Sequence, residues 1–109
     1  ATKASRTMIR QLEEDQKRRS KRALTDAIDR ALIDLLAIYR DVLMVQVGGD
    51  GELINTDLAD LVHEIAQDST PRQTLARVDH IETARKRLVS NGNPLLVLED
   101  MAISLRPQA

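Results

Sequence analysis

The chain has 109 residues and a net charge of -1, with 42% hydrophobic and 30% charged residues. This length suffices for one modest hydrophobic core, so we expect one folded unit. Because the chain contains no cysteine, disulfides, Cys-ligated zinc and thiol catalysis are excluded. The single aromatic residue, Tyr39, leaves few side chains on which the bases of a single-stranded nucleic acid would stack.

The hydropathy pattern gives no sign of a membrane segment. No apolar stretch approaches the roughly 20 residues that span a bilayer, and the first residues lack the apolar core of a secretion signal. We therefore expect a cytoplasmic protein that makes no membrane contact.

The charges divide unevenly along the chain. Residues 1–22 carry eight basic and three acidic side chains, a net charge of +5, whereas residues 23–109 carry eight and fourteen, a net charge of -6. Within the run EEDQKRRSKR, Glu13–Arg22, each of three acids precedes a base by four residues, which stabilises a helix by a few tenths of a kcal/mol per pair. The run predicts a solvated helical extension or linker at residues 1–22, ahead of a helical domain at 23–109. Alternatively, its basic end contacts the backbone of a nucleic acid.

Helical periodicity dominates the next segment and predicts one long helix from about Ser5 to Val47. The apolar stripe expected to face the core comprises Leu24, Ala27, Ile28, Ala31, Leu32, Leu35, Ile38, Tyr39, Val42 and Val45. The sequence GGDG, Gly48–Gly51, ends the helix, because glycine permits the backbone of a tight connection.

Turn and cap signals mark two further helices. Asn55 is a suitable N-cap for a short second helix, and Thr70 with Pro71 predicts the start of a third helix that runs to about Ser90. The residues of the third helix that we expect to face the core are Leu75, Val78, Ile81, Leu88 and Val89.

The sequence NGNP predicts a junction between the third and fourth helices. Asn91 and Gly92 suit the end of a helix, Asn93 caps the next one, and Pro94 occupies its first position. No segment shows the alternating apolar pattern of a strand. The sequence therefore predicts an all-α fold, a small bundle of about four helices with a long N-terminal helix.

Two of these helices carry apolar residues outside the expected core stripe. In the first helix they are Ile33, Ala37 and Met44, and in the fourth they are Leu96 and Ile103. A helix that is apolar on two faces needs cover on both, which a bundle of this size does not supply. We predict that these five residues face a partner subunit. The alternative is scattered surface apolar residues, which are common.

Catalytic and metal-binding patterns are incomplete. HEIAQ, which starts at His63, has Gln67 where a zinc protease needs its second histidine, and His80 has no cysteines to complete a deaminase site. No nucleophile, base and orienting group are gathered, so we expect no enzymatic activity, no cofactor, no metal and no small-molecule substrate. Arg85 falls within the apolar stripe of the third helix, which predicts a buried salt bridge.

Three segments carry a resemblance to a known family. ALIDLLAIYRDVLMVQVG (31–48), LINTDL (53–58) and HIETARKRLVSNGNPLLVLEDMAISL (80–105) resemble the C-terminal helical domain of the delta-prime subunits of the bacterial DNA polymerase III clamp loader. The helix end YRD, Tyr39–Asp41, and the junction at Asn91–Glu99 carry most of the likeness. The gamma or tau motor subunits have a similar domain.

The resemblance implies a role in DNA replication as a non-catalytic scaffold. Such domains pack side by side into the collar of a five-subunit assembly, with gamma/tau and delta subunits as the partners, while AAA+ modules bind ATP and open the sliding clamp. The AAA+ parts would lie upstream, and residues 1–22 would join the AAA+ lid to the collar domain at 23–109. We expect no direct DNA contact. The alternative is a stand-alone helical DNA-binding or regulatory protein that uses the basic run Lys17–Arg22.

Overall fold

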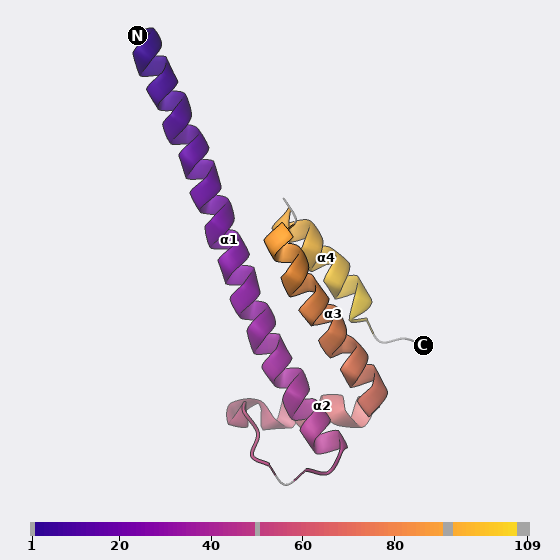
Figure 1. The fold of residues 1–109 in the computed structure, drawn as a ribbon. Coiled ribbons are helices and arrows are strands. Elements are labelled where there is room, and N and C mark those ends of the chain that lie inside the picture. The colour runs from indigo at the N-terminus through magenta and orange to yellow at the C-terminus, as the bar shows by residue number, and fades with distance from the viewer. Residues whose placement is uncertain (1, 50, 91–92, 107–109) are drawn as a thin grey trace.

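A computed structural model of the chain describes residues 2–49, 51–90 and 93–106 (Figure 1). These residues form four α-helices and one 3-10 turn, and they contain no strand. The helices are α1 (Lys3–Gln46), α2 (Ala59–Asp68), α3 (Pro71–Ser90) and α4 (Pro94–Ser104), with the 3-10 turn η1 (Thr56–Leu58) before α2. The all-α fold predicted from the sequence is confirmed.

The helix α1 is uninterrupted over 44 residues, and its length sets the longest dimension of the molecule, 69 Å. Thr2 caps its start, because the hydroxyl oxygen accepts a hydrogen bond from the Ser5 amide at 3.1 Å. At its end, Gly48 has φ +71°, and the Gly49 amide donates to the Met44 carbonyl at 3.0 Å. This pattern is a Schellman motif, in which the glycine adopts the left-handed conformation at no steric cost.

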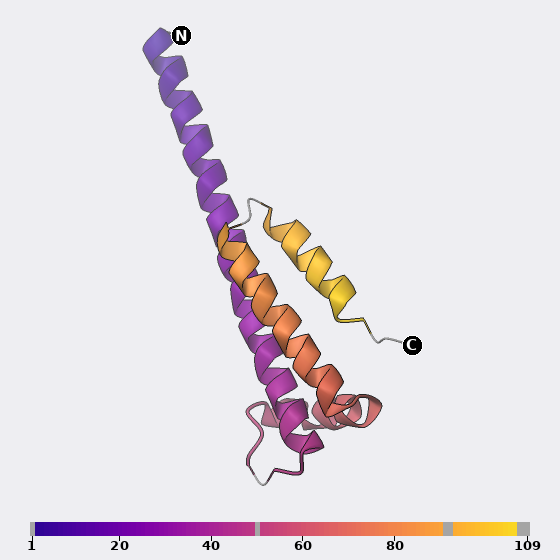
Figure 2. The ribbon, with the colours of Figure 1, turned by 45° about the vertical axis from the view of Figure 1, so that its right-hand side comes forward.

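Only the second half of α1 takes part in the bundle. Its buried residues begin at Ile28, whereas residues 3–24 are solvent-exposed apart from a half-buried Asp15. Figures 1 and 2 show this first half projecting beyond the other helices. The first half of α1, which we call the arm (residues 3–24), therefore gains nothing from burial within the described chain.

The core lies where α1, α3 and α4 meet. The helix α3 packs along α1, and α4 packs on α3, so that the three helices lie side by side in both views (Figures 1 and 2). The buried side chains are aliphatic, as a sequence without phenylalanine or tryptophan requires. They are Ile28, Leu32, Leu36, Ile81, Ala84, Leu88, Val97 and Met101.

The short helix α2 packs against the C-terminal end of α1, and Val62 and Val42 are completely buried in this part of the bundle. A capping box connects α2 to α3. The Gln73 amide donates to the Thr70 hydroxyl at 3.1 Å, and the Thr70 amide donates to the Gln73 side-chain carbonyl at 2.9 Å. The start of α3 at Thr70 and Pro71 is thus confirmed.

One glutamine joins the ends of three helices. The side-chain Nε2 of Gln46, the last residue of α1, donates to the Ser69 carbonyl at 3.0 Å and to the Ala66 carbonyl at 3.3 Å. Its Oε1 accepts a hydrogen bond of 2.7 Å from the hydroxyl of Thr74, which is fully buried in α3. The amide thereby satisfies carbonyl groups at the end of α2 that have no partner within that helix.

Three details of the sequence prediction are wrong. The core stripe of α3 runs through Thr74 and Ala84, and Leu75 and Val89 lie off it, the latter 90% exposed. The cause is helical phase, because both residues are about 100° or more around the helix from Ile81. Asn55 does not cap η1 with its side chain, because its amide donates to a carboxylate of α1 instead.

We expect Thr74→Val to lower the free energy of unfolding by about 1–2 kcal/mol, because it removes the hydroxyl but keeps the shape, leaving the Gln46 amide oxygen without its donor. Urea unfolding followed by circular dichroism measures the change. The matched control is Thr7→Val, which removes an exposed hydroxyl bonded to the Lys3 carbonyl. Equal effects of the two substitutions would contradict a role of Thr74 in joining the helices.

Candidate interaction surfaces

The first candidate surface lies on α1, on the side away from the core. Ile33 is 44% exposed, Met44 is also exposed and Ala37 is half-buried. Their neighbours Leu32 and Leu36 are buried against α3 and α4, so the helix has one covered and one uncovered apolar side. We call these three residues the α1 surface.

The second candidate surface lies on α4. Leu96 is 45% exposed and Ile103 is 59% exposed, whereas Val97 and Met101 are buried in the core. At 100° per residue, the first pair lies on the opposite side of α4 from the second. We call Leu96 and Ile103 the α4 surface.

The structure does not bring the two surfaces together. Each lies on the side of its helix that faces away from the shared core, and α3 packs against both helices (Figure 1). The chain therefore presents two separate apolar surfaces. A subunit that contacts two different neighbours requires this arrangement, since head-to-tail assembly uses a different patch on each side.

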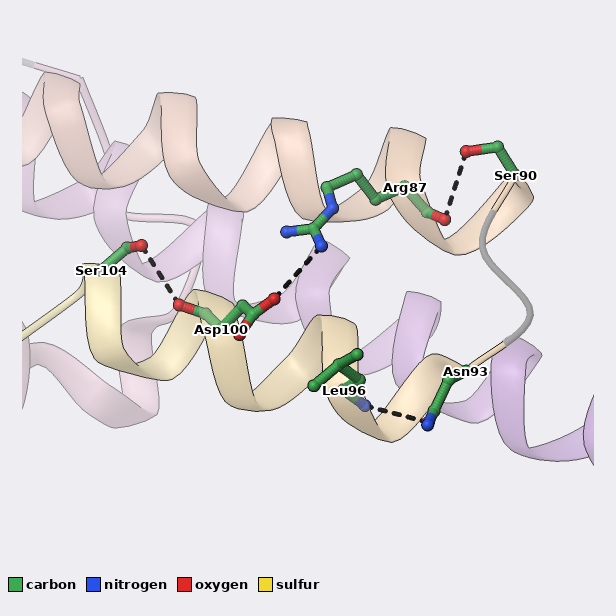
Figure 3. Close-up of polar contacts among 6 residues, drawn as sticks. All are labelled: Arg87, Ser90, Asn93, Leu96, Asp100 and Ser104. Atoms are coloured by element: carbon green, nitrogen blue, oxygen red, sulfur yellow. Dashed lines mark hydrogen bonds and ion pairs between the residues drawn. The ribbon is translucent and has the colours of Figure 1, made fainter.

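Polar contacts fix α4, and with it the α4 surface, onto α3 (Figure 3). Arg87 of α3 forms an ion pair of 3.2 Å with Asp100 of α4. The Asn93 side chain accepts a hydrogen bond of 3.1 Å from the Leu96 amide, and Pro94 is buried at the first position of the helix. The cap and start of α4 predicted at Asn93 and Pro94 are confirmed. The other two residues of the predicted junction, Asn91 and Gly92, lie outside the described residues.

Arg85 forms the salt bridge expected of it, but the prediction that this bridge is buried is wrong. Its Nε donates to Asp29 Oδ1 at 2.8 Å and its Nη2 donates to Oδ2 at 3.3 Å, which ties α3 to α1. The two side chains are 38% and 36% exposed, because Arg85 lies on the flank of the core stripe. The hydrogen bond from Arg85 lowers the pKa of Asp29 below its usual value.

Asp41 holds the connection between α1 and α2, although sequence reasoning gave it no role. This buried carboxylate accepts hydrogen bonds from the Ile54 amide at 2.7 Å, the Asn55 amide at 2.8 Å and the Asn55 side chain at 3.0 Å. Burial raises the pKa of Asp41, but the three hydrogen bonds outweigh it, so the pKa lies below its usual value. The carboxylate thus fixes the segment that precedes η1.

Met44 has a structural contact in addition to its exposed area. A Cβ added at Gly49 would collide with the Met44 sulfur, and one at Gly51 would lie 3.2 Å from its terminal methyl carbon. The methionine side chain therefore lies against the glycine-containing connection. Of the five candidates, Met44 is the one whose replacement also disturbs the fold.

Both missed residues carried a signal in the sequence. Asp41 and Gln46 are the polar residues in a run that is otherwise apolar from Val42 to Val47. A polar residue at such a position either interrupts the core or satisfies backbone groups of another segment. Here both side chains bond backbone atoms of segments that lie later in the chain.

The described residues gather no group of chemistry-bearing side chains. Among residues 2–49, 51–90 and 93–106, no three His, Asp or Glu side chains lie together in a way that could hold a metal ion. His63 and His80 are both exposed on their helices. No helix in the described ranges is long and apolar enough to cross a membrane.

The basic run lies on the exposed arm. Arg18 forms an ion pair with Asp15, three residues before it, and the Arg19 Nε donates to the Asp15 carbonyl at 3.4 Å. The expected pairing of Glu14 with Arg18 is therefore wrong, because Asp15 takes the guanidinium instead. Lys17, Lys21 and Arg22 are exposed.

Comparison with known proteins places the chain in a family. The family described as "DNA polymerase III, delta subunit, C terminal" matches residues 4–106, nearly the whole chain. The chain belongs to this family. Because the match begins in the arm and ends after α4, the DNA polymerase III delta C-terminal family accounts for all four helices.

A relative agrees with this assignment. The "DNA polymerase III subunit delta'" of Bacillus subtilis (strain 168) is 36% identical over 72 residues, which cover 66% of this chain but only 22% of that protein. No solved structure matches the chain. The resemblance to delta-prime C-terminal domains inferred from the sequence is thus confirmed, and the chain corresponds to a minor part of its relative in the delta C-terminal family.

We expect Asp41→Asn to lower the free energy of unfolding by about 2–3 kcal/mol at neutral pH. The neutral amide loses the charge-assisted bonds and turns an NH2 group toward a backbone amide that needs an acceptor. Urea denaturation measures the loss. Asp34→Asn, an exposed change on the same helix, is the matched control and should have little effect.

The same carboxylate predicts a pH dependence. Because the pKa of Asp41 is lower in the folded state than the value of about 3.9 in the unfolded chain, its stabilisation is fully present above that value and is lost as the pH falls through the folded-state pKa. Denaturation measured from neutral to acidic pH should show a smaller loss of stability in Asp41→Asn than in the wild type. Parallel curves would rule out this assignment.

Proposed function

We propose that this domain is a non-catalytic scaffold of a DNA polymerase III clamp loader. In this role it packs with neighbouring subunits, of the gamma/tau and delta types, into a collar that acts in DNA replication. The family assignment supports a clamp-loader subunit. The observation that carries the proposal is the pair of separate apolar surfaces, one on α1 and one on α4, since a subunit inside a ring has a neighbour on each side.

The arm and the bundle divide the work in this proposal. Residues 1–22 link the bundle to an upstream AAA+ lid, and residues 23–109 form the collar domain. The relative is much longer than the stretch it shares with this chain, which leaves room for the AAA+ modules elsewhere in such a subunit. By holding these modules together, the collar raises their effective concentration and fixes their order, so that ATP binding changes their geometry as a unit.

The α4 surface offers the sharper test, because Met44 of the α1 surface also lies against the glycine-containing connection. We expect Leu96→Asp and Ile103→Asp each to abolish co-elution with the collar domains of gamma/tau and delta subunits from the same organism, since a desolvated carboxylate at an apolar contact is costly. Size-exclusion chromatography with light scattering measures the assembly. Circular dichroism should show unchanged helicity.

Val89→Asp is the matched control, because it replaces an apolar residue that is 90% exposed and lies on neither surface. It should leave assembly intact. If the wild-type chain is folded and does not associate with these domains at tens of micromolar, the proposed role in the collar is wrong.

An alternative function is a stand-alone DNA-binding or regulatory protein, and it rests on the exposed basic residues of Lys17–Arg22. Under our proposal this run makes no direct DNA contact, so a titration of duplex DNA followed by fluorescence anisotropy should show no binding at physiological salt. Binding that weakens steeply as salt increases, and that Lys17→Glu/Lys21→Glu removes, would favour the alternative.

A further inference from the structure

The uncovered side of α1 continues along the whole helix. At 100° per residue, eight residues fall within about 30° of one line that runs opposite the buried residues Ile28 and Leu32. All eight are exposed or half-buried. In chain order they are Met8, Leu12, Asp15, Arg19, Asp26, Arg30, Ile33 and Ala37. We call them the far face of α1.

The far face has an ordered pattern of chemistry. Apolar residues lie at both ends, Met8 and Leu12 on the arm and Ile33 and Ala37 beside the bundle, and four charged residues lie between them. Figures 1 and 2 show α3 and α4 packed on the other side of α1, and the arm extending past them. The far face is therefore an uncovered strip that begins on the arm and ends beside the bundle.

We propose that the far face binds the same face of a second copy of this chain, with the two α1 helices antiparallel. In the register that sets Met8 opposite Ala37, Leu12 lies opposite Ile33, which buries both apolar ends. The same register sets Asp15 opposite Arg30 and Arg19 opposite Asp26, so every charged residue of the far face meets its opposite sign. Two-fold symmetry produces each of these contacts twice.

Charge selects the antiparallel orientation. A parallel pair in register would set Asp15, Arg19 and their counterparts against identical residues, and like charges at such positions repel. In the antiparallel pair the nearest like charges are the two copies of Arg22 beside the two-fold axis. Each has Asp26 one turn further along its own helix, which offsets the repulsion.

The shape of the molecule permits this pairing. Because the arm extends past the bundle, an antiparallel pair places the two bundles at opposite ends, and each arm lies along the α1 helix of the other copy (Figure 1). The paired stretch ends near Ala37, before Met44 and the glycine-containing connection. Asp15 already pairs with Arg18 of its own helix, so its carboxylate is shared between two guanidinium groups.

This inference does not rest on the proposed function. It uses Ile33 and Ala37 of the α1 surface, so a paired copy cannot present these residues to a different subunit. It leaves Leu96 and Ile103 uncovered. The charged residues that test it lie outside both candidate surfaces, so the self-pairing and the collar role can fail separately.

A charge exchange within one chain tests the register. In low salt at tens of micromolar, light scattering should give the mass of two chains for the wild type, and added salt should shift it toward one chain. Asp15→Arg and Arg30→Asp should each give the mass of one chain. The double variant Asp15→Arg/Arg30→Asp should recover the mass of two, since each exchanged residue again faces an opposite charge.

Lys21→Asp is the matched control, because it changes the net charge as Arg30→Asp does but lies well off the far face. It should keep the mass of two chains. The mass of one chain for the wild type in low salt, or no recovery in the double variant, would overturn the proposal. Circular dichroism on each variant separates lost pairing from lost helix.

Cross-linking distinguishes the two orientations directly, because the natural chain has no cysteine. A short thiol-reactive cross-linker should join Leu12→Cys to Ile33→Cys when the two variants are mixed, and should join little of either variant alone. Efficient cross-linking of Leu12→Cys to itself would indicate a parallel pair and refute the antiparallel register.

Discussion

The side-chain amide of Gln46 joins the ends of α1, α2 and α3, and the arrangement of the bundle depends on it. Both of its functional groups are used, the NH2 group on carbonyls of α2 and the residue after it, the oxygen on the hydroxyl of Thr74. A helix of only ten residues buries little area and is marginal by itself. Its orientation therefore has to come from directional bonds at its ends, as well as from the burial of Val62.

A bundle of this size cannot cover every apolar side chain that its helices carry. Its core takes one stripe from each of α1, α3 and α4, and the remaining apolar residues of α1 and α4 stay on the surface. In a core made of aliphatic side chains, aromatic area does not add to the stability, so the ion pairs and caps that fix α4 on α3 carry more weight. The same residues thus determine how rigidly the α4 surface is held.

Much of the fold followed from the sequence, and the failures have identifiable causes. Glycine and proline at Gly48, Pro71 and Pro94 fix helix ends through backbone sterics, which act locally and can be predicted. The faces of α3 could not be predicted as well, because Thr74 and Ala84 occupy core positions where a hydropathy pattern favours Leu75 and Val89. Asp41 escaped the sequence reading because its bonding partners lie 13 and 14 residues later, in a segment without periodicity.

The continuity of α1 has a mechanical consequence. Since no glycine, proline or π-bulge interrupts the helix from Lys3 to Gln46, it bends little and moves as one body. The distance from Ile28 to Lys3 is about 37 Å at 1.5 Å per residue, so a tilt of about 5° at the bundle displaces the tip by about 3 Å. Small reorientations at the core are thereby amplified into motions as large as a side-chain contact at the far end of the molecule.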